Sequence, residues 1–131
     1  MRKKTKHLSS LVGIDVNLFD ARLKNFEEPK NTFCQNCKKQ CDYKNIHQYA
    51  SYESVRWDGK YIYYCPMDFI FVAIPLIDED DIMNGGVILG PIIMGEAEDF
   101  EDTFGLPQME TAKVNDLAEI ASVVFSERKA Q

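Results

Sequence analysis

The sequence predicts an α+β domain in which helices pack on one side of an antiparallel β-sheet. Two apolar runs, 69–77 and 86–94, are separated by a short acidic segment, which is typical of a hairpin at the centre of a sheet. In the last segment, 114–125, the apolar residues fall near one face of a helix. With 131 residues, of which 45% are hydrophobic, the chain can bury one core and is too short for two domains.

The remaining segments complete this prediction. Residues 11–19 alternate between apolar and polar, which is the pattern of a half-buried strand, and 23–26 can pair back as a short second strand. The composition of 33–56 favours two short helices, and the aromatic segment 60–64 favours another strand. The charged residues 1–7 are expected to be a disordered, solvated tail.

Charge and hydropathy restrict the classes of function. The formal net charge is -6, from 21 acidic and 15 basic residues, which argues against direct binding of nucleic acid. No apolar run approaches the roughly 18 to 20 residues that a membrane-spanning helix needs, and no signal peptide is visible. We therefore expect a cytoplasmic protein without a membrane segment, in a compartment that keeps thiols reduced.

The four cysteines are the most informative local feature. Cys34, Cys37 and Cys41 are spaced i, i+3 and i+7, which places them on one face of a helix, and Cys65 follows a predicted strand. Four reduced thiols could ligate zinc or an iron–sulfur cluster. The alternatives are small apolar residues in the core or a pocket wall, and a redox switch. We expect no cofactor, with the metal site as the alternative.

Catalysis finds no support in the sequence. Of the two histidines, His7 lies in the expected tail and His47 is expected on an exposed helix, and neither has a neighbour that suggests a nucleophile and its base. The carboxylates gather in predicted loops, where solvation is the ordinary interpretation. We therefore predict that the chain is not an enzyme.

Aromatic residues surround the segment 65–68 and favour a small-molecule pocket. Pockets for organic ligands are mostly apolar with a few well-placed polar groups, and tyrosine hydroxyls, a thiol and the carboxylate of Asp68 fit that description. For any one of these aromatic residues, a place in a plain core is an equally good interpretation. They are Tyr61, Tyr63, Tyr64, Phe69 and Phe71.

Three motifs carry a resemblance to a known family. The segments Tyr64–Phe69 (YCPMDF), Val72–Ile77 (VAIPLI) and Gly86–Pro91 (GVILGP) resemble the PocR sensory-domain family, and Cys34 and Cys41 are similar to its upstream cysteines. The resemblance covers about residues 13–94. It implies a PAS-like fold that binds small molecules such as short diols and other simple hydrocarbon derivatives. It also implies an output module, such as an AraC-type DNA-binding domain or a histidine kinase.

The sequence departs from the family pattern in two places. Asp68 stands where the family usually has a glycine, which puts a potential charge near the expected pocket mouth. Cys37 is an additional cysteine that keeps the metal alternative open.

Together, these observations predict a sensory domain that binds a small organic metabolite between helices and sheet and signals to an output module. The alternative is a metal-binding or redox-responsive regulatory module built on the four cysteines. The C-terminal helix could also pair with its copy in a homodimer. The candidate ligand-binding residues are Cys34, Tyr63, Cys65, Asp68, Phe69, Phe71 and Gly90.

Overall fold

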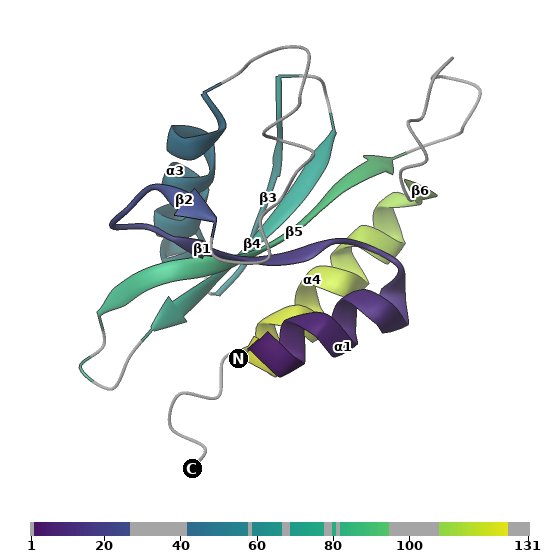
Figure 1. The fold of residues 1–131 in the computed structure, drawn as a ribbon. Helices are drawn as coiled ribbons and strands as arrows, with labels where there is room; N and C mark the ends of the chain where they lie inside the picture. The colour runs from purple at the N-terminus through teal and green to yellow at the C-terminus, as the bar shows by residue number, and fades with distance from the viewer. Residues whose placement is uncertain are drawn as a thin grey trace.

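The computed structural model describes residues 2–26, 42–57, 59–66, 69–77, 80, 82–94 and 108–125. Within the described residues, a helix comes first and is followed by a short hairpin, a further helix, three consecutive strands and a C-terminal helix (Figure 1). In order, the elements are α1 (Arg2–Val12), β1 (Val16–Asp20), β2 (Asn25–Phe26), α3 (Tyr43–Arg56), β3 (Tyr61–Tyr64), β4 (Ile70–Ile77), β5 (Met83–Met94), β6 (Gln108–Met109) and α4 (Thr111–Phe125).

Five antiparallel strands form the sheet, in the order β2-β1-β5-β4-β3. The predicted hairpin is confirmed: β4 and β5 pair along their length, with Val72 opposite Leu89, and β5 is the central strand. On its other side β5 pairs with β1, where Val16 also lies opposite Leu89. The short β6 adds to the end of β5 in parallel. This arrangement confirms the predicted α+β, PAS-like fold.

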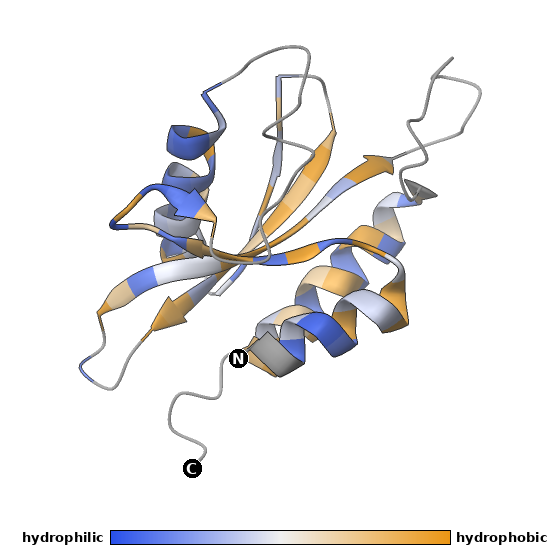
Figure 2. Cartoon of the chain, viewed as in Figure 1, coloured by the Kyte–Doolittle hydropathy of each residue, from blue (hydrophilic) through white to orange (hydrophobic). Residues whose placement is uncertain are grey.

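Helices cover both faces of the sheet, not one face as the sequence predicted (Figure 1). Along β4, Ile70, Val72 and Ile74 pack with α1 and α4, whereas Phe71 and Ala73 alternate with them and pack beneath α3. In Figure 2 the orange, apolar colour predominates along β4, on residues that point to both faces of the sheet. A continuous apolar run of this kind indicates a strand that is buried on both faces, which is the physical reason for the second layer.

The N-terminal segment also differs from the prediction. Residues 2–12 are helical, so the expected tail at 1–7 and the expected strand start at 11 are both wrong. Thr5 and Leu8 are buried, and the ammonium of Lys4 donates a hydrogen bond to the carbonyl of Val124 at the end of α4 (3.0 Å). Gly13 ends the helix with a φ of 70°, and its amide donates to the carbonyl of Ser9, as in a left-handed helix cap.

Of the two short helices predicted within 33–56, the structure describes one, α3, and residues 33–41 lie outside the described residues. The predicted strands at 23–26 and 60–64 are β2 and β3. The turn between β1 and β2 is closed by Asp20, whose carboxylate accepts hydrogen bonds from the amides of Arg22 and Leu23. The terminal amphipathic helix is α4, which buries Val114, among other apolar residues, against the sheet. Of the helices in the described residues, none is long and apolar enough to cross a lipid bilayer.

Candidate functional site

The structure describes five of the seven predicted ligand-binding residues. Phe71 is fully buried under α3, and Phe69 is buried just before β4. Tyr63 lies on β3 with only 8% of its surface exposed, and Cys65 is half-buried at the end of that strand. The amide of Cys65 donates to the carbonyl of Phe69 (2.8 Å), which holds the turn between β3 and β4.

The fifth described residue is Gly90, at the centre of β5. Its φ is 128°, a conformation that residues with a side chain rarely adopt. A Cβ atom there would lie 2.7 Å from the carbonyl oxygen of Ile70 and 2.9 Å from the ring of Phe71. Gly90 therefore lets β4 and the Phe71 ring approach the strand closely. The remaining two residues, Cys34 and Asp68, lie outside the described residues.

His47 lies at the centre of this region and was not among the predicted site residues. We expected it on an exposed helix surface, but it is 1% exposed. It lies on the face of α3 that also buries Ala50, Ser51 and Ser54, at helical spacing. The residues on this face are small rather than large and apolar, so α3 can approach the sheet closely. A Cβ atom on Gly86 would lie 2.6 Å from the hydroxyl oxygen of Ser51. The helical spacing of these small residues is the feature of the sequence that could have indicated the burial of His47.

A shell of aromatic rings encloses the imidazole of His47. Among the described residues, the closest ring is that of Phe71, with centroids 4.9 Å apart at 71°, and four further rings lie within 6.4 Å. These four belong to Phe19, Phe26, Tyr43 and Tyr63. The shell combines residues from β1, β2, α3, β3 and β4, so it exists only when the sheet has formed.

Within this shell, Nδ1 of His47 is hydrogen-bonded to the hydroxyl of Tyr63 at 2.6 Å. Burial lowers the pKa of His47 from 6.5 to about 3, because the charged imidazolium would lose its hydration there. The imidazole is therefore neutral near pH 7, and the hydrogen bond fixes the position of the Tyr63 hydroxyl. The ring of Tyr63 is further held by stacking on Phe71, with centroids 5.8 Å apart and planes at 23°.

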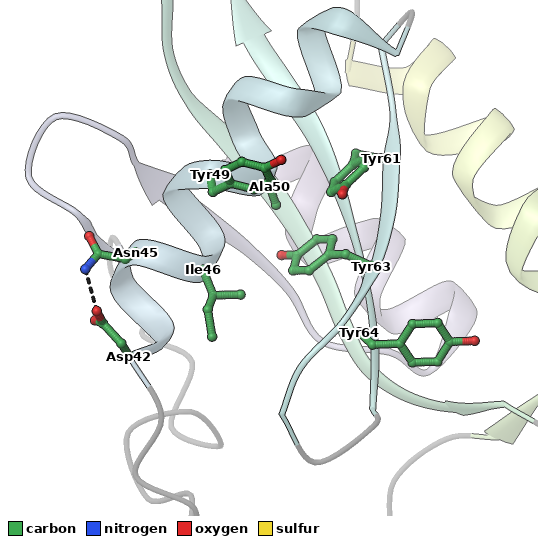
Figure 3. Close-up of a pocket in the computed structure, with 8 residues that line it drawn as sticks. All are labelled: Asp42, Asn45, Ile46, Tyr49, Ala50, Tyr61, Tyr63 and Tyr64. Carbon is green, nitrogen blue, oxygen red and sulfur yellow. Dashed lines mark hydrogen bonds between the residues drawn. The ribbon is translucent and has the colours of Figure 1, made fainter.

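Next to this pair, a pocket of about 380 Å³ opens between α3 and β3 (Figure 3). Its volume falls in the range of small-molecule sites, and its surface is mostly apolar. In Figure 3 the rings of Tyr61 and Tyr63 face Ile46 and Tyr49 across the gap, while the ring of Tyr64 points away from it. The lining residues are Asp42, Asn45, Ile46, Tyr49, Ala50, Tyr61, Tyr63 and Tyr64.

The pocket coincides only in part with the predicted site. Tyr63 is the predicted residue that lines it, and Phe71 supports Tyr63 from behind through ring stacking. Cys65 packs against the same aromatic cluster without lining the pocket. The pocket was predicted near the β3–β4 turn, without residues from α3. The sequence does not show which face of that helix meets the sheet.

Hydrogen bonds orient the polar groups at the pocket rim. The hydroxyl of Tyr49 donates to the carboxylate of Glu53 (3.1 Å), and this bond is the largest cause that raises the pKa of Tyr49 above its usual value. Arg56 pairs with the other carboxylate oxygen of Glu53 (3.2 Å). At the start of α3, the amide of Asn45 donates to the carboxylate of Asp42.

The predicted metal site cannot be located in the described part of the chain. Cys34, Cys37 and Cys41 lie outside it, and Cys65 lies inside it. Among the residues that the structure describes, no group of three or more His, Cys, Asp or Glu side chains is placed to hold a metal ion. Zinc or iron–sulfur ligation by the four cysteines stays a prediction.

This geometry defines a small α+β domain with a ligand-sized pocket, backed by a buried neutral histidine. A protein-family model described as the sensory domain found in PocR matches residues 1–128. The chain belongs to the PocR sensory-domain family, as the motifs in the sequence suggested. Neither a search of curated proteins nor a search of solved structures found a match. Membership of a family of sensory domains indicates a sensing role.

Proposed function

We propose that this domain senses a small organic metabolite that binds in the pocket between α3 and β3. The observation that carries the proposal is the Tyr63 hydroxyl at the pocket wall, fixed by its 2.6 Å hydrogen bond to a buried, neutral His47. A polar group held rigidly in a mostly apolar pocket can orient a small ligand at little entropic cost. The role is binding rather than catalysis, and the proposed compartment is the cytoplasm.

The proposed ligand site extends from the pocket to the residues behind it. Tyr63 makes direct contact, and Phe71 supports its ring from behind by stacking. Phe69 belongs to the proposal because its carbonyl holds the amide of Cys65 at the end of β3. Cys65 and Gly90 set the position of β3 and β5 around the aromatic cluster. Cys34 and Asp68 belong to the proposal on the strength of the sequence motifs.

We further propose that α4 carries the signal to an output module, of the AraC-type DNA-binding or histidine kinase kind that the family resemblance implies. The ammonium of Lys60 pairs with the carboxylate of Glu119 on α4 at 2.8 Å. Lys60 precedes Tyr61, which lines the pocket, so a ligand that moves β3 also moves one partner of this pair. A homodimer through α4 belongs to the same proposal.

A thermal-shift screen of the 131-residue chain against short alcohols, diols, amines and carboxylic acids tests the pocket. A ligand at 100 times its dissociation constant stabilises the native state by about 2.7 kcal/mol. For a domain of this size that raises the unfolding midpoint by roughly 5 to 15 °C. Ile46→Trp should reduce the shift, because Ile46 lines the pocket and an indole there would take up part of the space that a ligand needs.

The matched control is Val55→Trp, on the same helix but outside the pocket lining, which should leave the shift unchanged. Equal shifts in wild type and Ile46→Trp would place the ligand elsewhere. A screen without any hit would remove the support for a small-molecule sensor.

A further inference from the structure

The charge and hydrogen-bonding groups of the pocket identify the class of ligand, an inference that rests on the proposed function. We propose that the pocket selects a small organic cation, a protonated primary amine on a short hydrocarbon chain, over a neutral alcohol and over a carboxylate. Three independent properties of the lining support this: its charge, its hydrogen-bond acceptors and its aromatic rings.

The lining carries one charged side chain, the carboxylate of Asp42, and no lysine or arginine among the described residues. The positive end of the α3 dipole lies at the same place, but it is equivalent to about half a charge and Asp42 contributes a full negative one. Arg56, on the same helix, is paired with Glu53 and so adds no net charge. A carboxylate ligand would find no cation here, whereas an ammonium would find a counter-charge.

Two polar groups at the pocket donate hydrogen bonds within the protein, and acceptor lone pairs remain on them or on their partners. A carboxylate only accepts hydrogen bonds, so the Tyr49 hydroxyl donates its one proton to Glu53 and can only accept a hydrogen bond from a ligand. Asn45 donates one amide hydrogen to Asp42, and this carboxylate has further lone pairs that can accept from a ligand. An ammonium group has three donors and no acceptor, and therefore complements this rim better than a hydroxyl group does.

The pocket walls suit both ends of such a ligand. The rings of Tyr49 and Tyr61 are inclined at 69° with centroids 6.5 Å apart, so they form two sides of a corner (Figure 3). The face of a tyrosine ring attracts a cation within about 6 Å of its centroid. Ile46 and Ala50 supply apolar surface for a hydrocarbon chain. The net charge of -6 also favours the approach of a cation over that of an anion.

Isothermal titration at low salt and pH 7.5 tests this with three probes of equal chain length: n-pentylamine, n-pentanol and pentanoate. We expect n-pentylamine to bind about fivefold more tightly than n-pentanol, and pentanoate to bind most weakly. Asp42→Asn should reduce the preference for the amine about threefold and leave n-pentanol unchanged. Asp42 is the N-cap residue of α3, and asparagine is an equally good N-cap, so the helix is retained.

The matched control is Asp116→Asn, which removes the same charge from the exposed surface of α4 and should keep the full preference. The cation inference is overturned by n-pentanol binding as tightly as n-pentylamine, or by Asp42→Asn leaving their ratio unchanged. If n-pentanol binds and Ile46→Trp weakens its binding, the sensor proposal stands without the charge selectivity.

The thermal-shift screen decides the case in which none of the three probes binds. A hit that carries an amine then supports the cation inference, and a hit without one overturns it. No hit at all overturns both proposals.

Discussion

The burial of His47 predicts a specific loss of stability in mild acid. In the folded state burial holds the pKa of His47 at about 3, whereas an unfolded chain has the ordinary value of 6.5. Below pH 6.5 the unfolded state therefore binds a proton that the folded state does not. Because the folded pKa is the lower one, this contribution to stability is fully present above pH 6.5 and is lost as the pH falls towards 3.

The size of the effect follows from the two pKa values. Integrating the linkage relation from pH 7 to pH 5 gives a loss of about 2 kcal/mol in the free energy of unfolding. The free energy of unfolding of a domain is usually about 5 to 15 kcal/mol, so a loss of about 2 kcal/mol is a large part of it. In this pH window the ordinary aspartate and glutamate side chains titrate little, so the histidine dominates.

Urea unfolding at pH 7.0, 6.0 and 5.0, followed by circular dichroism, measures the loss. His47→Gln removes the titrating group, so the variant should lose less than about 0.5 kcal/mol across the same range. The loss is measured within each protein between pH 7.0 and pH 5.0. A lower stability of His47→Gln at pH 7.0 therefore does not affect the comparison. His7→Gln is the matched control, because His7 is exposed on α1 and its replacement should leave the full loss.

A wild-type loss below about 0.5 kcal/mol, or an equal loss in His47→Gln, would refute the reasoning. Should His47→Gln fail to fold, the imidazole resonances of His47 give a second measurement in the wild-type chain. They should show no titration between pH 8 and pH 5.

Two further predictions concern the aromatic cluster and the central strand. Phe71→Ala should lower the free energy of unfolding, measured with urea, by about 3 to 5 kcal/mol, because it empties a fully buried site beneath α3. The control is Ile120→Ala, on an exposed face of α4, which should lower it by less than about 1 kcal/mol. Gly90→Ala should lower the free energy of unfolding by more than about 2 kcal/mol, because its Cβ would meet a backbone oxygen at 2.7 Å in a strained conformation; a near-neutral result would contradict the close approach of β4 and β5.

Most of the fold could be predicted from local sequence patterns. The β4–β5 hairpin and α4 follow from apolar runs and helical periodicity, because each element must present its apolar residues to a core. The N-terminal helix was missed because Val12, Ile14, Val16 and Leu18 alternate across the end of α1, Gly13 and the start of β1. Alternation that spans a helix cap and a strand cannot be distinguished from a longer strand without the burial of Leu8 and Thr5.

The candidate site was less predictable than the fold. The aromatic residues of β3 and β4 were identified, since their composition indicates a pocket or a core. The histidine was assigned to the surface, because polar residues at helical spacing usually face solvent. Its burial depends on the small residues of α3 and on Gly86, which together let the helix approach the sheet.

The sequence by itself determined the class of fold, the central hairpin and the family, because these depend on residues that are close along the chain. Only the tertiary structure decided that helices cover both faces and that His47 meets Tyr63, 16 residues away, inside a shell of rings from five elements. The reason is physical: periodicity fixes which face of an element is apolar, but the order of strands in the sheet decides which faces meet.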